Sequence, residues 1–132
     1  MINRQTRLVT AEAVRRGHPD KLCDQIADAI LDAHLSYDPN ARVAVEVMAT
    51  AGNITVAGEV TSRASVNYEK IVLGVIQQIG YKWADLCESE DDELNIDVAV
   101  HDQSPDIAAA VEGRYPDSDQ GAGDQGIMVG YA

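Results

Sequence analysis

The sequence contains no phenylalanine, so aliphatic residues must supply most of any hydrophobic core. Its two cysteines, Cys23 and Cys87, lie far apart and do not form the spacing of a metal or redox motif. No apolar stretch is long enough to cross a bilayer, and the first residues lack the apolar core of a signal peptide. These absences argue against a membrane protein and against a disulfide framework, and they predict a cytoplasmic location.

Basic residues are also scarce. The 132 residues include 22 Asp and Glu against 10 Lys and Arg, which gives a formal net charge of −12. This charge repels phosphate backbones, so we expect no nucleic-acid partner. Several acids gather in residues 88–93, a run typical of a solvated loop. A protein with this negative charge needs local cations or a bound metal ion in order to bind a polyphosphate.

The hydrophobic periodicity predicts four strands and two helices. Pro19 suits the first turn of a helix, and Asn67 and Gly80 suit the two ends of the second. A short turn containing Gly52 predicts a hairpin between the middle strands. In chain order the expected elements are strand 7–13, helix 19–37, strands 42–50 and 54–61, helix 68–79 and strand 94–100.

This β-α-β-β-α-β order is the split βαβ pattern, an α+β class with two helices on one face of a four-stranded sheet. In the hairpin strands both alternating sets are largely apolar, with Val45 and Val47 in one set and Ala44 and Met48 in the other. A sheet with one wet face rarely has this pattern. We therefore expect the second face to be covered by further sequence or by another subunit.

The run Gly17-His18-Pro19-Asp20-Lys21 lies where the first helix is predicted to begin. A helix N-terminus offers free N–H groups and positive potential to an anion, and Lys21 adds a charge. His18 is able to donate to a phosphate oxygen, and Asp20 is a hard oxygen ligand suited to Mg²⁺. The alternative is purely structural, since many helices begin with Pro-Asp.

Glu46 and Glu59 lie inside the apolar hairpin strands. A carboxylate on a covered face needs a cation, a pairing partner or a charged substrate group, whereas one on a wet face needs none. For Glu46 both interpretations stay open. The Gly-rich residues 121–126 lack the standard phosphate-loop signatures, and His34 and His101 have no partner motif and are interpreted as structural or exposed.

Together these segments resemble the S-adenosylmethionine synthetase (methionine adenosyltransferase) family. The resemblance extends over almost the whole chain, in the family's order and spacing. The matching segments are Gly17 to Ile26, Asp38 to Ala41, Val56 to Thr61, Tyr68 to Val72, Ile79 to Tyr81, Asp102 to Ile107 and Gly121 to Ala132.

The resemblance implies S-adenosylmethionine synthesis from ATP and L-methionine, with attack of the methionine sulfur on ATP C5′ and release of pyrophosphate and phosphate. It implies a fold of three intertwined βαββαβ repeats. It also implies a homo-oligomer, dimeric or tetrameric, whose subunits pair through flat sheet faces with active sites between them.

The resemblance further implies the site residues and the cofactors Mg²⁺ and K⁺. His18 matches the catalytic residue that contacts the ATP triphosphate, Asp20 matches a Mg²⁺ ligand, and Glu46 matches a K⁺ ligand. Glu59, Gln103 and, less closely, Asp124 match methionine-binding residues. The expected division of the chain is an N-terminal repeat over 1–102, a mobile active-site loop with the Gly-rich motif over 103–126, and a truncated first strand of the next repeat over 127–132.

The chain departs from the family pattern at three places. Arg15-Arg16 stands where the family has Ser-Glu, Thr50-Ala51 stands where it has Lys-Thr, and Val129 stands where it has Phe. The chain also corresponds to about the first third of a family chain, so we expect it to be inactive alone. The alternative is a non-catalytic truncated homologue that acts as an oligomerisation or interaction module.

Overall fold

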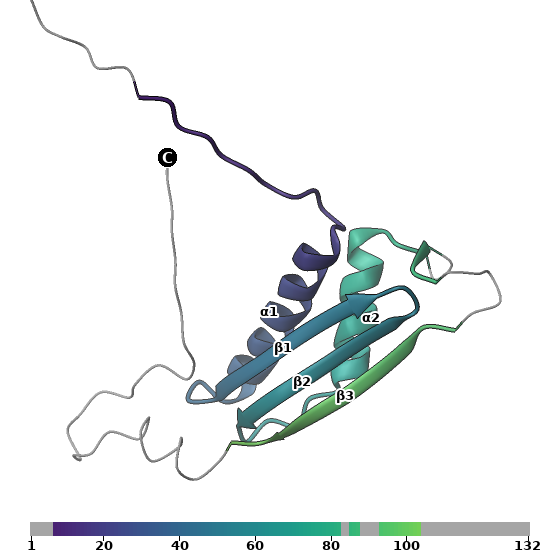
Figure 1. Cartoon of the computed structure of the whole chain (residues 1–132). Helices are drawn as coiled ribbons and strands as arrows, with labels where there is room; N and C mark the ends of the chain where they lie inside the picture. The colour runs from purple at the N-terminus through teal and green to yellow at the C-terminus, as the bar shows by residue number, and fades with distance from the viewer. Residues whose placement is uncertain (1–6, 83–84, 88–92, 104–132) are drawn as a thin grey trace, which may run out of the picture.

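The computed structural model describes residues 7–82, 85–87 and 93–103. Two helices cover one face of a three-stranded sheet, as Figure 1 shows, so the α+β class predicted from the sequence is confirmed. The elements are α1 (Pro19–Tyr37), β1 (Arg42–Thr50), β2 (Asn53–Thr61), α2 (Tyr68–Ile79) and β3 (Asn95–Asp102).

Both helices begin and end where their capping residues predict. Pro19 is the first residue of α1, and α1 ends at Tyr37, just before the Asp38-Pro39 pair. Asn67 caps α2 by accepting a hydrogen bond from the Lys70 backbone N–H at 2.8 Å. Gly80 ends α2 in the left-handed conformation, with φ of 96°.

The sheet has the order β1-β2-β3. β1 and β2 pair antiparallel as the predicted hairpin, closed by the two-residue turn Ala51-Gly52, in which Gly52 has φ of 70°. β2 and β3 pair parallel, from Asn53 opposite Asn95 to Val60 opposite Asp102, and α2 forms the crossover between them. The core lies between the helices and the sheet and consists of aliphatic side chains, among them Leu22, Ile26, Ile30, Ile54, Val56, Val72 and Ile76.

Two details of the predicted topology are wrong. Residues 7–13 form no strand: Leu8 is 93 % exposed, Val9 is 56 % exposed, and the segment runs away from the sheet (Figure 1). Apolar composition alone does not hold a strand that has no pairing partner. Since β2 and β3 are direct neighbours, the β2-α2-β3 unit is an ordinary βαβ crossover and not a split one.

The sheet face opposite the helices is open in the described part of the chain. Glu46 and Met48 on β1 are exposed, and Met48 is 65 % exposed despite its apolar side chain. This outer face therefore stays available for the cover that the sequence predicts. Among the described residues, neither helix is long and apolar enough to cross a membrane.

The Asp38 carboxylate joins the end of α1 to the segment after β2. Asp38 is 5 % exposed, and it accepts hydrogen bonds from the Arg63 backbone N–H at 2.9 Å and from the Arg63 guanidinium at 3.0 Å. The hydrogen bonds from the Arg63 side chain and backbone lower the pKa of Asp38 from 3.8 to about 2. The Asp38-Pro39-Asn40 segment thus has a structural role in this fold.

A buried histidine predicts how the fold responds to acid. His34 is 2 % exposed, and its Nε2 lies 3.1 Å from the Tyr68 hydroxyl. Burial lowers the pKa of His34 below its ordinary value of 6.5. As the pH falls, the unfolded chain takes up the proton first. The contribution of His34 to stability is therefore complete above pH 6.5 and is lost as the pH falls through the pKa of the folded state.

Urea unfolding between pH 7.5 and 5 measures this effect. The free energy of unfolding should fall across that range in the wild-type chain, and His34→Gln should flatten the decrease. The matched control is His101→Gln, because His101 is exposed on β3. Equal pH dependence in all three proteins would contradict the assignment to His34.

Candidate functional site

The start of α1 is held in place by a tyrosine from beyond α2. Gly17 has φ of 88°, a conformation that favours glycine, and its carbonyl oxygen accepts a hydrogen bond from the Tyr81 hydroxyl at 2.5 Å. A Cβ atom at position 17 would lie 3.0 Å from that hydroxyl oxygen. Glycine at 17 therefore allows the close approach that fixes the residues after it.

His18 is the N-cap of α1, and the hydrogen bond that its ring accepts there indicates which ring nitrogen carries the proton. Its Nδ1 accepts a hydrogen bond from the Asp20 backbone N–H at 3.2 Å. In a neutral imidazole whose Nδ1 is the acceptor, Nε2 carries the hydrogen. The His18 side chain is 43 % exposed, so it offers an Nε2–H donor beside a helix N-terminus, the kind of site that favours an anion.

The Asp20 carboxylate projects from the first turn of α1. It is 83 % exposed, and its Oδ2 lies 3.8 Å from His18 Nδ1. An oxygen ligand so accessible is suited to share a hard cation with an incoming phosphate group. His18 and Asp20 therefore lie together, as the sequence predicts for a phosphate and metal site.

The neighbouring basic residues are bound to backbone carbonyls. Lys21 Nζ donates to the Val14 carbonyl at 2.9 Å, although the sequence suggested a free charge for an anion. Arg16 donates to the Gln78 carbonyl in the last turn of α2 at 2.8 Å, where a cation complements the helix dipole. The unusual arginine at position 16 thus contacts the end of α2.

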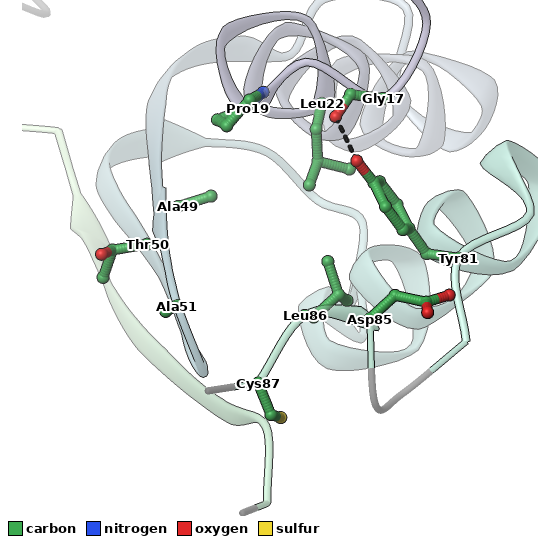
Figure 2. A pocket seen from close by; sticks show the side chains of 10 residues that line it. All are labelled: Gly17, Pro19, Leu22, Ala49, Thr50, Ala51, Tyr81, Asp85, Leu86 and Cys87. Atoms are coloured by element: carbon green, nitrogen blue, oxygen red, sulfur yellow. Dashed lines mark hydrogen bonds between the residues drawn. The ribbon is translucent and has the colours of Figure 1, made fainter. Parts of the chain in front are cut away.

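A pocket of about 230 Å³ lies beside this corner. Figure 2 shows Gly17 and Pro19 on one side of it, Tyr81 and Leu86 on another, and the end of β1 opposite. Its lining is mostly apolar, and neither His18 nor Asp20 contributes to it. The pocket therefore adjoins the polar corner but does not contain the groups suited to phosphate chemistry.

Glu46 and Glu59 lie on the outer face of the sheet. Glu46 pairs with Ala57, and Glu59 pairs with Ala44 and His101, so both carboxylates stand in rows of small or polar residues. Glu46 is exposed and Glu59 is partly buried. The interpretation of Glu46 as a residue on a covered face is not met within the described chain, because nothing described lies over it.

Gln103 follows β3 and is held by two residues from the neighbouring strands. Its Oε1 accepts a hydrogen bond from Arg42 Nε at 3.1 Å, and the Thr61 hydroxyl lies 3.5 Å away. Arg42 is only 8 % exposed. Arg42 was not among the residues predicted from the sequence, although a lone arginine at the start of an apolar strand indicates that it has a partner.

The start of α1 and Gln103 lie near opposite ends of β1. The start of α1 adjoins Ala49 and Thr50 at the end of β1, whereas Gln103 contacts Arg42 at the beginning of β1.

No group of three or more metal-ligating side chains lies within the described ranges. Asp20 and Glu46 each fit as one ligand of a cation site, and further ligands have to come from elsewhere. Asp124, residues 104–126 of the predicted loop over 103–126, and the predicted strand over 127–132 lie outside the described residues.

Fold and site define an α+β domain that presents an imidazole and a carboxylate at the start of α1 and an open outer sheet face that carries Glu46 and Glu59. Comparison with known proteins shows the family to which this domain belongs. The family model described as S-adenosylmethionine synthetase, N-terminal domain, matches residues 6–105, and the chain belongs to this family.

Similar curated proteins agree with this assignment, and each is called S-adenosylmethionine synthase. The protein of Mesoplasma florum is 50 % identical over 126 residues, which cover 96 % of this chain and 33 % of the relative. That of Mycoplasma mycoides is 49 % identical, over 98 % of this chain and 33 % of the relative. That of Bacteroides thetaiotaomicron is 47 % identical, over 95 % and 29 %. The chain spans about a third of the length of these relatives.

Proposed function

We propose that this chain supplies the N-terminal part of an active site that makes S-adenosylmethionine from ATP and L-methionine, and that it is inactive alone. The observation that carries the proposal is the start of α1, where His18 and Asp20 form a corner suited to triphosphate and a metal ion. The name of the relatives, S-adenosylmethionine synthase, supports the synthesis of S-adenosylmethionine as the reaction. That the chain spans about a third of the relatives' length supports its inactivity alone.

In this proposal His18 donates its Nε2–H to a triphosphate oxygen. Because Nδ1 is engaged by the Asp20 N–H, the ring is oriented before the substrate arrives. A donor fixed in advance stabilises the negative charge that grows on the triphosphate as the methionine sulfur attacks C5′. The triphosphate then leaves and is hydrolysed to pyrophosphate and phosphate.

We assign Mg²⁺ to Asp20 and K⁺ to Glu46. Bound Mg²⁺ would neutralise the triphosphate, which an acidic protein otherwise repels. Both carboxylates are exposed, as a single ligand of a shared cation site should be. Glu59 and Gln103, with Asp124, are assigned to methionine.

We further propose that the outer face of the sheet pairs with a second subunit. This face is open and carries small and apolar residues such as Ala44, Met48 and Ala57. Pairing there would cover Met48 and place an additional chain over Glu46 and Glu59. It would also explain why the predicted residues of one chain do not converge. We place the protein in the cytoplasm.

A hybrid enzyme tests the proposal. In the hybrid synthase, this chain replaces the corresponding N-terminal third of the Mesoplasma florum protein. With Mg²⁺, K⁺, ATP and L-methionine, we expect the hybrid to form S-adenosylmethionine and the purified 132-residue chain to form almost none. A folded hybrid without turnover would contradict the function, and would favour a non-catalytic module. Robust turnover by the chain alone would contradict the proposal that it is inactive alone.

A further inference from the structure

A buried arginine beside the proposed methionine residues has no role in the function proposed so far. Arg42 opens β1 and is 8 % exposed, which is rare for an arginine without a specific task. Its Nε lies 3.1 Å from Gln103 Oε1. Thr61, its cross-strand partner, places a hydroxyl 3.5 Å from the same oxygen. Arg42 on β1, Thr61 on β2 and Gln103 just after β3 thus form one row of contacts.

The chemistry of this row fixes which end of the Gln103 amide faces outward. Arginine only donates hydrogen bonds, so the atom facing Arg42 Nε has to be the amide oxygen. The Thr61 hydroxyl donates to the same oxygen. With the oxygen held by these two donors, the amide NH₂ group is the end left to bind a ligand.

The adjacent row of the same sheet face carries complementary chemistry. Glu59 lies two residues before Thr61 on β2, so the two side chains share a face and stand about 7 Å apart along the strand. The Glu59 carboxylate accepts hydrogen bonds, whereas the Gln103 NH₂ group donates them. Together they match the ammonium and the carboxylate of a free amino acid.

We propose that Arg42 is a positioning residue that holds the Gln103 amide with its NH₂ group toward the carboxylate of L-methionine. This role rests on the proposed function, because that function places methionine at Glu59 and Gln103. Without Arg42 the amide is free to rotate and to present its oxygen, which repels a carboxylate.

Nuclear magnetic resonance of the 15N-labelled 132-residue chain tests the role of Arg42 without any ligand. The Gln103 side-chain resonances are identified by their loss in Gln103→Ala. In the wild type their 15N heteronuclear NOE should match that of the ordered backbone. Arg42→Met should lower it to the value of the exposed Gln77 side chain, and Arg7→Met, the same change at an exposed arginine, should leave it unchanged. An ordered Gln103 amide in folded Arg42→Met would overturn the proposal.

The reciprocal variant keeps the test decisive if Arg42→Met does not fold. In Gln103→Ala the Arg42 Nε–H loses its acceptor, while the core is untouched. Its exchange with solvent should be about tenfold faster than in the wild type, in keeping with the loss of a hydrogen bond from a charged donor. An unchanged exchange rate would overturn the proposal.

Adding L-methionine to the hybrid synthase, which carries the whole proposed site, separates this proposal from the proposed function. L-methionine should shift the Gln103 side-chain resonances of the hybrid, and L-methioninol, which has no carboxylate, should not. If L-methionine shifts them equally in the hybrid with Arg42→Met, the role of Arg42 is wrong and the methionine contact stands. If the hybrid shows an ordered amide but no shift, the methionine contact is wrong and the orientation by Arg42 stands.

Discussion

Asp20→Asn is expected to lower kcat/KM of the hybrid synthase by about 100-fold or more, because an asparagine keeps the shape of the side chain but loses the charge that holds Mg²⁺. The His18 side chain still caps α1 by accepting a hydrogen bond from the residue-20 backbone N–H in this variant, so α1 should begin at the same residue. The loss should therefore appear in turnover and in the Mg²⁺ concentration needed for half-maximal rate. Thermal stability should change little, because the Asp20 side chain is 83 % exposed.

The matched control is Asp28→Asn, which removes one negative charge from an exposed position of the same helix. It should leave kcat/KM within about twofold of the parent hybrid, as expected for a surface substitution away from the site. Steady-state rates at several Mg²⁺ concentrations measure both variants. A similar loss in the two would point to the overall charge of α1, and full activity of Asp20→Asn would remove Asp20 from the site.

Gly58→Ala is expected to destabilise the chain by about 3 kcal/mol or more, the largest stability effect of the substitutions considered. Gly58 has φ of 147°, and a Cβ there would overlap the Ala44 carbonyl oxygen and lie 2.9 Å from Val45 Cα. Both neighbours are backbone atoms of β1, so neither a rotamer change nor a small shift relieves the overlap. The variant must either separate β1 from β2 or bend β2 just before Glu59.

Gly74→Ala is the matched control, since Gly74 lies within α2 and a Cβ there would meet nothing within 4 Å. It should stabilise the chain by about 0.5–1 kcal/mol, because alanine favours the helix. Thermal unfolding followed by circular dichroism compares the two. Gly58→Ala should lower the melting temperature by about 10 °C or more and Gly74→Ala should raise it. Equal midpoints would show that β1 and β2 tolerate a side chain at position 58.

The helices and the hairpin were predictable because their signals are local. The proline at position 19, the cap Asn67 and the terminal Gly80 act within one helical turn, and the structure places the helix ends at these residues. The α+β class followed from the order of these elements. The parallel pairing of β2 with β3 involves residues 42 apart, as in Asn53 with Asn95, so no local pattern specifies it.

The segment 7–13 shows the limit of composition as evidence. Its leucine, valine and threonine residues favour a strand, yet a strand also needs a partner with free hydrogen-bonding groups. The structure gives this segment none among the described residues. The same reasoning applies to the outer face, where Val-rich strands predict a cover that the described chain does not contain.

The candidate site was predictable in part. The pairing of His18 with Asp20 follows from their places at the start of one helix, and the structure keeps the two together. The contact of Arg42 with Gln103 was not predictable, because it joins residues 61 apart across the sheet. The bonds of Arg16 and Lys21 to carbonyl oxygens likewise depend on where α2 and the segment before α1 lie. Roles for Glu46, Glu59 and Asp124 stay predictions.

A crystal structure of the hybrid synthase with Mn²⁺ in place of Mg²⁺ and a non-hydrolysable ATP analogue tests the central proposal most directly, since anomalous scattering locates the metal. We expect a metal peak about 2.1 Å from an Asp20 carboxylate oxygen, bridging to the triphosphate, with His18 Nε2 within hydrogen-bond distance of a triphosphate oxygen. An occupied nucleotide site with its metal and triphosphate away from Asp20 and His18 would contradict it.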